Sequence, residues 1–93
     1  MEDKKLTEKL DLLLNILSTR VRYMRAWNAV TVSHNETLFT IRWYEWMGEP
    51  SNTALFQEIT YPLDMLSRII TEQKNKLKKD IPDTDKNVLR LVL

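Results

Sequence analysis

The chain of 93 residues contains one histidine, His34, in a predicted turn over residues 33–36. Imidazole is the side chain most often used as a general base near neutral pH. No serine or carboxylate stands at a recognisable catalytic spacing from it, and the absence of cysteine excludes thiol catalysis, zinc fingers and disulfides. Carboxylate pairs such as Asp83 and Asp85 lack the ligand density and turn glycine of a calcium loop. We therefore expect no enzyme activity, no catalytic residue, no metal and no cofactor.

Two basic clusters are the next candidates for chemistry. One interleaves arginines with aromatic residues near the end of an N-terminal helix, and the other crowds the end of a second helix. Such residues bind phosphates, and rings beside arginine offer stacking surfaces to single-stranded bases. The same lysines would also stabilise a helix C-terminus, and Arg20 could instead pair with an acid across an interface. The nucleic-acid-binding candidates are Arg20, Arg22, Arg25, Lys74, Lys76, Lys78 and Lys79.

Composition limits the function classes. The chain is 43% hydrophobic and 29% charged, which predicts a folded protein, and its length predicts one domain over residues 1–93. Fourteen Lys and Arg against thirteen Asp and Glu give a net charge of +1, so neither a globally basic nucleic-acid binder nor an acidic nucleic-acid mimic is expected. The longest apolar stretches fall short of a signal sequence or a membrane span. A cytoplasmic protein without membrane contact is the expectation.

The elements that position these residues begin with a long helix, predicted over residues 3–27. Apolar side chains occupy more than half of its circumference, in one main stripe and a second stripe beside it. A helix of this length spans about 37 Å, whereas a compact chain of this size has a radius of gyration of about 12 Å. Part of the helix should then overhang its own domain and form a homodimer interface, for which the candidates are Leu12, Ile16, Tyr23 and Trp27.

The middle of the chain is rich in β-branched and aromatic residues, which predicts strands over residues 29–32, 37–46 and 53–60. Turn residues over 47–52 join the last two strands. Pro62 then starts a second helix that ends before Asp80 and Pro82. The pattern of residues 82–93 fits a fourth strand or a short helix equally well. We predict an α+β fold in which a three-stranded antiparallel meander lies between the N-terminal helix and the second helix.

Alternation along the long strand predicts one core face, with Phe39, Ile41 and Trp43, and an outer face. A turn of about five residues would set Trp43 opposite Leu55 and Phe39 opposite Ile59, so that the core face is uniformly apolar. The outer face then mixes aromatic rings with charge, as protein-binding surfaces do. It is either a binding surface or is covered by the second helix or the apolar tail. Its candidate residues are Arg42, Tyr44, Trp46 and Phe56, with Glu58 beside them.

The sequence thus favours binding over catalysis. The leading hypothesis is a small cytoplasmic interaction or regulatory protein, homodimeric and acting by protein contact, of the accessory kind that bacterial and phage genomes encode. Its partners would be a second copy of the chain and an unidentified protein, with no small-molecule substrate. The alternative is an accessory protein that binds nucleic acid weakly through the two basic clusters. A third reading is an inhibitor or antitoxin-type partner of an enzyme.

Overall fold

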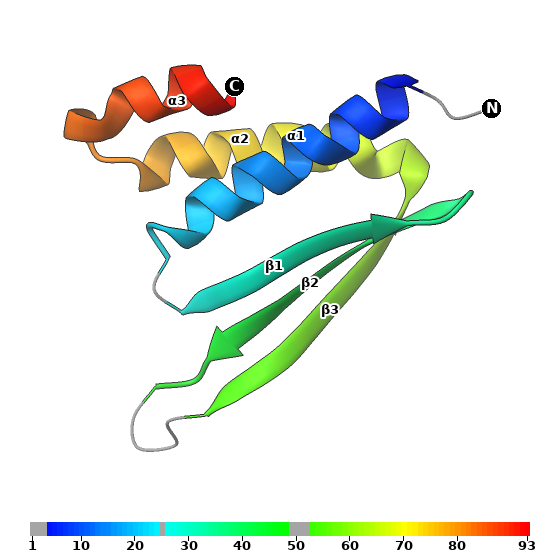
Figure 1. The fold of residues 1–93 in the computed structure, drawn as a ribbon, viewed down its shortest axis with the longest axis horizontal. Helices are drawn as coiled ribbons and strands as arrows, with labels where there is room; N and C mark the ends of the chain where they lie inside the picture. Colours follow the sequence, from blue (N-terminus) through cyan, green and yellow to red (C-terminus); the bar gives the residue numbers. More distant parts are fainter. Residues whose placement is uncertain (1–3, 25, 49–52) are drawn as a thin grey trace.

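A computed structural model describes residues 4–24, 26–48 and 53–93 of the chain. Their order is α-β-β-β-α, as predicted, with two single-turn 3-10 helices and a further short helix at the C-terminus. The elements are α1 (Lys4–Val21), β1 (Trp27–His34), β2 (Leu38–Trp46), β3 (Ala54–Pro62), η1 (Leu63–Met65), α2 (Leu66–Asp80), η2 (Asp83–Asp85) and α3 (Lys86–Val92). Figure 1 shows the three strands beneath α1 and α2, with α3 beyond these helices on the side away from the sheet.

The sheet is an antiparallel meander in the order β1-β2-β3, which confirms the predicted α+β architecture. The predicted partners were wrong by two residues, since Trp43 lies opposite Gln57 and Phe39 lies opposite Tyr61. The connection between β2 and β3 is longer than the five residues assumed, and its residues 49–52 lie outside the described part of the chain. A shift of two keeps every side chain on its predicted face. The core face is nevertheless not uniformly apolar, because Gln57 belongs to it.

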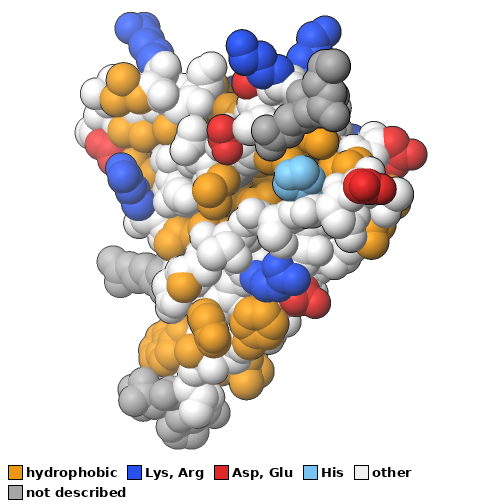
Figure 2. All heavy atoms as spheres, turned by 45° about the vertical axis from the view of Figure 1, so that its right-hand side comes forward, with side chains coloured by type: hydrophobic (Ala, Val, Ile, Leu, Met, Phe, Trp, Pro, Cys, Tyr) orange, Lys and Arg blue, Asp and Glu red, His pale blue; other side chains and the backbone are white. Residues whose placement is uncertain are grey.

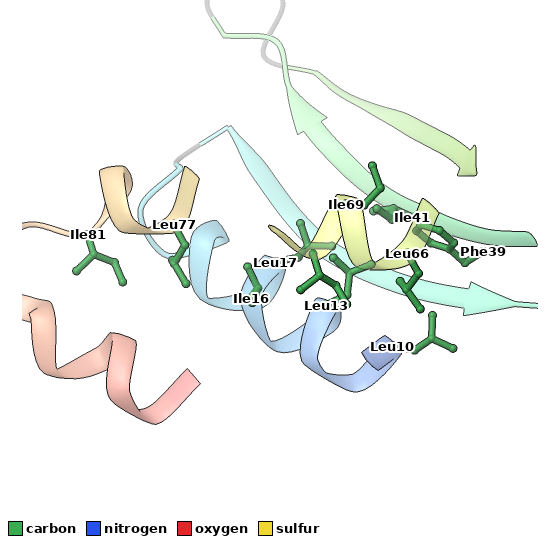
Figure 3. Packing of buried hydrophobic residues seen from close by; sticks show 11 residues of the cluster. Leu10, Leu13, Ile16, Leu17, Phe39, Ile41, Leu66, Ile69, Leu77 and Ile81 are labelled. Atoms are coloured by element: carbon green, nitrogen blue, oxygen red, sulfur yellow. The ribbon is translucent and has the colours of Figure 1, made fainter. Parts of the chain in front are cut away.

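The hydrophobic core lies between the sheet and the two long helices (Figure 3). It fills one face of α1 and one face of α2 and reaches the sheet through the middle strand, because alternation turns every second residue of β2 towards the helices. Its buried members are Leu10, Leu13, Ile16, Leu17, Phe39, Ile41, Leu66, Ile69, Ile70, Leu77 and Ile81.

The first helix is shorter than predicted, because α1 ends at Val21 rather than near residue 27. Turn hydrogen bonds follow at once, with the amides of Tyr23 and Met24 both donating to the carbonyl of Arg20 at 2.9 Å. At ~1.5 Å per residue the helix is about 27 Å long. The overhang that motivated an interface along this helix is therefore absent.

Trp27, expected near the end of the helix, is instead the first residue of β1. Its ring stacks on that of Trp43 with centroids 4.2 Å apart, and its Nε1 donates to Oε1 of Glu45 at 2.6 Å. The pairing of β1 with β2 then shifts at a bulge after Asn28, where Ala29 has φ of 54°. A bulge of this kind adds one residue and twists the strand locally. Trp27 thus stabilises the pairing of β1 with β2.

A buried ion pair joins the ends of α1 and α2. Nε of Arg20 donates to Oδ2 of Asp80 at 2.7 Å, and Nη1 donates to Oε1 of Gln73 at 2.6 Å. The Arg20 side chain is only 10% exposed. A charge this deeply buried must be paired, because an unpaired one would cost several kcal/mol. The acid that pairs with Arg20 comes from the same chain rather than from a partner.

The C-terminal tail resolves as a helix, the second of the two possibilities that the sequence left open. Val88, Leu89 and Val92 of α3 pack against the core cluster, while Leu91 on the opposite side is 84% exposed. Nζ of Lys86 donates to the carbonyls of Lys78 and Ile81, at 2.9 and 3.1 Å. These bonds satisfy carbonyl groups at and just beyond the end of α2.

Tyr23, after α1, ties the first helix to η2, and this contact has a pH dependence. Its hydroxyl donates to Oδ2 of Asp85 at 3.2 Å, and partial burial, followed by the Asp85 carboxylate, raises the pKa of Tyr23 above its ordinary value of 10.0. The contact therefore contributes full stability below about pH 10 and loses it as the pH rises through the folded-state pKa.

We expect the Tyr23→Phe variant to lack this part of the alkaline loss. The measurement is the free energy of unfolding of both proteins in urea, at several pH values between neutrality and strongly alkaline conditions. Lysine titration affects both proteins equally, so it cancels in the difference between their free energies of unfolding. Parallel stability curves for the two proteins would show that the Tyr23 hydroxyl makes no pH-linked contribution.

The molecule is elongated, with principal extents of 48 × 31 × 17 Å. Its radius of gyration is 14.3 Å, against about 12 Å for a compact chain of this length. In Figure 1 the end of the hairpin formed by β2 and β3 projects beyond the helices. The projecting end is exposed on both of its faces.

Candidate functional site

The face of the sheet turned away from the helices is uncovered, so of the two readings left open by the sequence, the covered one is wrong. We call this surface the open face. Tyr44, Trp46 and Phe56 are each exposed by more than two fifths, and α1 and α2 both lie on the opposite face (Figure 1). In chain order the open face comprises Thr31, Ser33, Leu38, Thr40, Arg42, Tyr44, Trp46, Ala54, Phe56, Glu58 and Thr60.

Aromatic and apolar side chains gather where the hairpin projects. Tyr44 and Phe56 are direct cross-strand partners, and their rings meet edge to face with centroids 5.5 Å apart. Phe56 is 53% exposed and Tyr44 is 44% exposed, so each ring keeps about half of its surface in water. Figure 2 shows apolar side chains concentrated at this end of the molecule. Contiguous exposed apolar surface on a folded protein typically marks an interaction site.

A polar network beside the rings crosses all three strands. Arg42 on β2 donates through Nε to Oε2 of Glu58 on β3 at 2.6 Å, and through Nη1 to Oγ of Ser33 on β1 at 2.6 Å. Thr40 and Thr60 share a further hydroxyl hydrogen bond of 2.9 Å. These bonds fix the guanidinium between side chains of the two neighbouring strands, so it is preorganised for contact next to Tyr44. Rings and paired charge thus form one surface.

Sequence reasoning missed three exposed apolar residues, two at the same end and one in the middle of β3. Met47, which follows β2, is 50% exposed, and Leu55 and Ile59 on β3 are 47% and 38% exposed. Leu55 and Ile59 were assigned to the core by alternation, and they do lie on the core side of the sheet. Leu55 lies where the hairpin extends beyond the helical layer, whereas Ile59, opposite the buried Ile41, belongs to the edge strand β3. Alternation gives the face of a residue but not whether another element covers it.

The helix residues proposed for a dimer interface lie mostly inside the chain. Ile16 is fully buried, and Leu12 is half-buried against the core cluster. Tyr23 and Trp27 are half-buried and bonded to Asp85 and Glu45 of their own chain. The second apolar stripe of α1 therefore packs within the chain, against α2 and α3, and the expectation that Ile16 faces a partner is wrong.

The basic residues do not form one patch. Arg20 is buried against Asp80, so it is removed from the set that could touch phosphates, and Arg22 is exposed. Arg25 lies outside the described residues. On α2, Lys76 and Lys78 are exposed and 200° apart around the helix axis at 100° per residue. Lys79 is exposed and Lys74 half-buried, so the four lysines point in several directions.

His34 ends β1 and is exposed, with Nδ1 3.2 Å from the carbonyl oxygen of Asn35. It borders a hollow of about 140 Å³ that Thr7, Asp11 and Val32 also line. Sequence spacing could not have predicted that these residues lie together, since they come from α1 and β1. Pockets for small organic ligands usually enclose about 300–1,000 Å³, so this hollow suits a few water molecules better.

Three negative findings complete the description of the candidate sites. The chain matches no protein-family model, no curated protein and no solved structure. Within residues 4–24, 26–48 and 53–93, no three His, Asp or Glu side chains are grouped so that they could hold a metal ion. No helix in the described part of the chain is long and apolar enough to cross a lipid bilayer.

Proposed function

We propose that this protein is a non-catalytic interaction protein of regulatory or accessory type that acts in the cytoplasm by binding another protein through its open face. The observation that carries the proposal is the cluster of half-exposed rings Tyr44, Trp46 and Phe56 on a hairpin that projects beyond the helices. Keeping such rings in water costs free energy that a bound partner would recover at about 25 cal/mol per Å² of apolar surface.

The composition and charge of the open face favour a protein partner over nucleic acid. Tyr, Trp, Phe and Arg are the residues enriched at the centres of protein interfaces. Here the arginine of the open face, Arg42, is already paired with Glu58, so the surface carries little net positive charge to attract phosphates. The lysines of α2 lie on the other side of the sheet from the rings, because α2 packs on the core face. Stacking of bases next to those lysines is therefore not supported.

We expect Tyr44→Ala and Phe56→Ala each to weaken partner binding by about 1–3 kcal/mol, roughly 5- to 150-fold, as loss of an aromatic anchor does. Their free energies of unfolding should fall by less than about 1 kcal/mol, because half of each ring is already in water. Leu91→Ala is the matched control, since it removes an apolar side chain that is 84% exposed on α3.

The measurement is affinity capture from the native cell with the four proteins immobilised, followed by mass spectrometry and titration of the captured candidate. Proteins retained by the wild type and by Leu91→Ala, but lost from Tyr44→Ala and Phe56→Ala, support the proposal. Equal retention by all four proteins would contradict it. Retention that nuclease treatment abolishes would favour nucleic acid instead.

A further inference from the structure

The third strand leaves a row of unpaired backbone groups along the edge of the sheet. The amide of Met47 donates to the carbonyl of Thr53 and that of Leu63 to the carbonyl of Thr37, each at 2.9 Å. In an antiparallel pair the bonded positions recur every two residues, so the odd-numbered residues of β3 direct their backbone groups towards β2. The N–H and C=O groups of Ala54, Phe56, Glu58 and Thr60 consequently point out from the free edge.

This edge lacks the devices that normally prevent strand pairing. Folded proteins protect their edges with lysines, prolines, bulges or very short strands. The opposite edge, β1, has the bulge after Asn28 and lies against α1. In contrast, β3 is nine residues long, pairs with β2 in unbroken register, and has its proline only at the last position, Pro62. Its one charge, on Glu58, is engaged in an exposed ion pair with Arg42 of its own chain.

We infer that this edge binds a second copy of the chain, antiparallel to the first, with the two-fold axis at Gln57. Phe56 of each copy then lies opposite Glu58 of the other, and Ala54 lies opposite Thr60. All four outward-facing residues of both copies exchange N–H and C=O bonds. Leu55, 47% exposed, meets Ile59 of the second copy, 38% exposed, on the helix side of the sheet. The two sheets become one sheet of six strands.

Charge and hydrogen bonding disfavour the two registers whose axis is shifted towards Pro62. An axis at Glu58 would place the two Glu58 carboxylates directly opposite each other, which is destabilising. An axis at Ile59 would set Phe56 opposite Pro62, which has no N–H to donate. With the axis at Gln57, every charge faces an uncharged residue and every outward donor has an acceptor. The register centred on Gln57 therefore pairs all four outward-facing residues within β3 without opposing like charges.

The dimer goes beyond the proposed function, because it uses the edge of β3, whereas partner binding uses the open face. The axis stands perpendicular to the sheet, so the open faces of both copies lie on the same side. Phe56 of each copy is one residue from the axis, and the two ring clusters form one continuous surface. A partner would meet two equivalent sites, but a single copy retains its own open face if pairing fails.

The test introduces charged side chains that face each other across the interface only in the proposed register. Leu55→Lys with Ile59→Lys places a lysine opposite a lysine twice across the proposed interface, whereas Leu55→Glu with Ile59→Lys places a glutamate opposite a lysine twice. Within one chain these positions are four residues apart along a strand, about 13 Å, so their mutual interaction is screened in either variant. Leu91→Lys serves as the control for adding a lysine at an exposed apolar position.

We expect a dimer at tens of micromolar by sedimentation velocity for the wild type and for Leu91→Lys. The lysine–lysine variant should be a folded monomer, with its dimer dissociation constant raised more than about tenfold, and the glutamate–lysine variant should recover the dimer. Both double variants contain Ile59→Lys, so any loss of folding from that change is common to both and is visible by circular dichroism.

Amide hydrogen exchange tests the edge without any substitution. In the dimer the amides of Ala54, Phe56, Glu58 and Thr60 should become protected as protein concentration rises, while amides of α1 keep constant protection. A monomeric wild type at this concentration, or a dimer that the lysine–lysine variant leaves unchanged, would overturn the inference. If Tyr44→Ala still dimerises but loses its partner, dimerisation and the proposed function are shown to be separate.

Discussion

Ile16→Glu is expected to unfold the protein. Ile16 is fully buried against Leu13, Leu17 and Leu77, so the new carboxylate would have to be buried or the core opened. Either outcome costs at least about 4 kcal/mol, a large part of the ~5–14 kcal/mol that stabilises a domain of this size. Circular dichroism and thermal unfolding measure the effect.

Ser18→Glu is the matched control, because Ser18 lies on the exposed side of the same helix. Its free energy of unfolding should change by less than about 0.5 kcal/mol. The sequence alone placed Ile16 on a partner-facing stripe, for which the same substitution would give a folded or poorly soluble monomer. A cooperatively unfolding Ile16→Glu protein of near-normal stability would therefore restore that interpretation and contradict the packing described above.

Asp80→Ala is expected to cost about 2–4 kcal/mol of stability, because it leaves the buried Arg20 guanidinium without its counter-charge. Asp80 is 27% exposed, which keeps the loss below that for a fully buried pair. In an Arg20→Met background the same Asp80→Ala change should cost much less, since no buried charge remains. Urea unfolding of the four proteins gives the coupling energy.

The Arg42–Glu58 pair provides a comparison at nearly the same bond length. Its Nε–Oε2 distance is 2.6 Å, against 2.7 Å for Arg20–Asp80, but its side chains are 39% and 46% exposed. Glu58→Ala should therefore cost at most about 1 kcal/mol, and salt should weaken this pair more. Equal costs for Asp80→Ala and Glu58→Ala would show that burial does not set the strength of these pairs.

The sheet was predictable from the sequence because its signals are local. Alternation placed Phe39 and Ile41 in the core and Arg42 and Tyr44 on the open face, and these assignments hold although the assumed turn length was wrong. The side-chain period of a strand is two, and the register error was also two. The ring cluster was thus assembled from spacing alone.

The end of the first helix was not predictable in this way. No glycine or proline stands between Val21 and Trp27, so nothing in the local sequence stops the helix. It ends at Val21, where Arg20 is held by Asp80, and Trp27 is held by Trp43 and Glu45. These partners are distant in sequence, and their contacts outweigh helix propensities of less than 1 kcal/mol per residue.

By itself, then, the sequence determined the order of the elements, the faces of the strands and the absence of cysteine chemistry, because periodicity and composition act over a few residues. Only the tertiary structure decided which apolar surfaces remain exposed. The two stripes of α1 pack against α2, α3 and the sheet. The end of the hairpin, in contrast, extends beyond the helices and leaves Leu55 in water, and no described element covers Phe56 on the open face. Coverage depends on the relative lengths and placement of elements far apart in the chain, which no local pattern encodes.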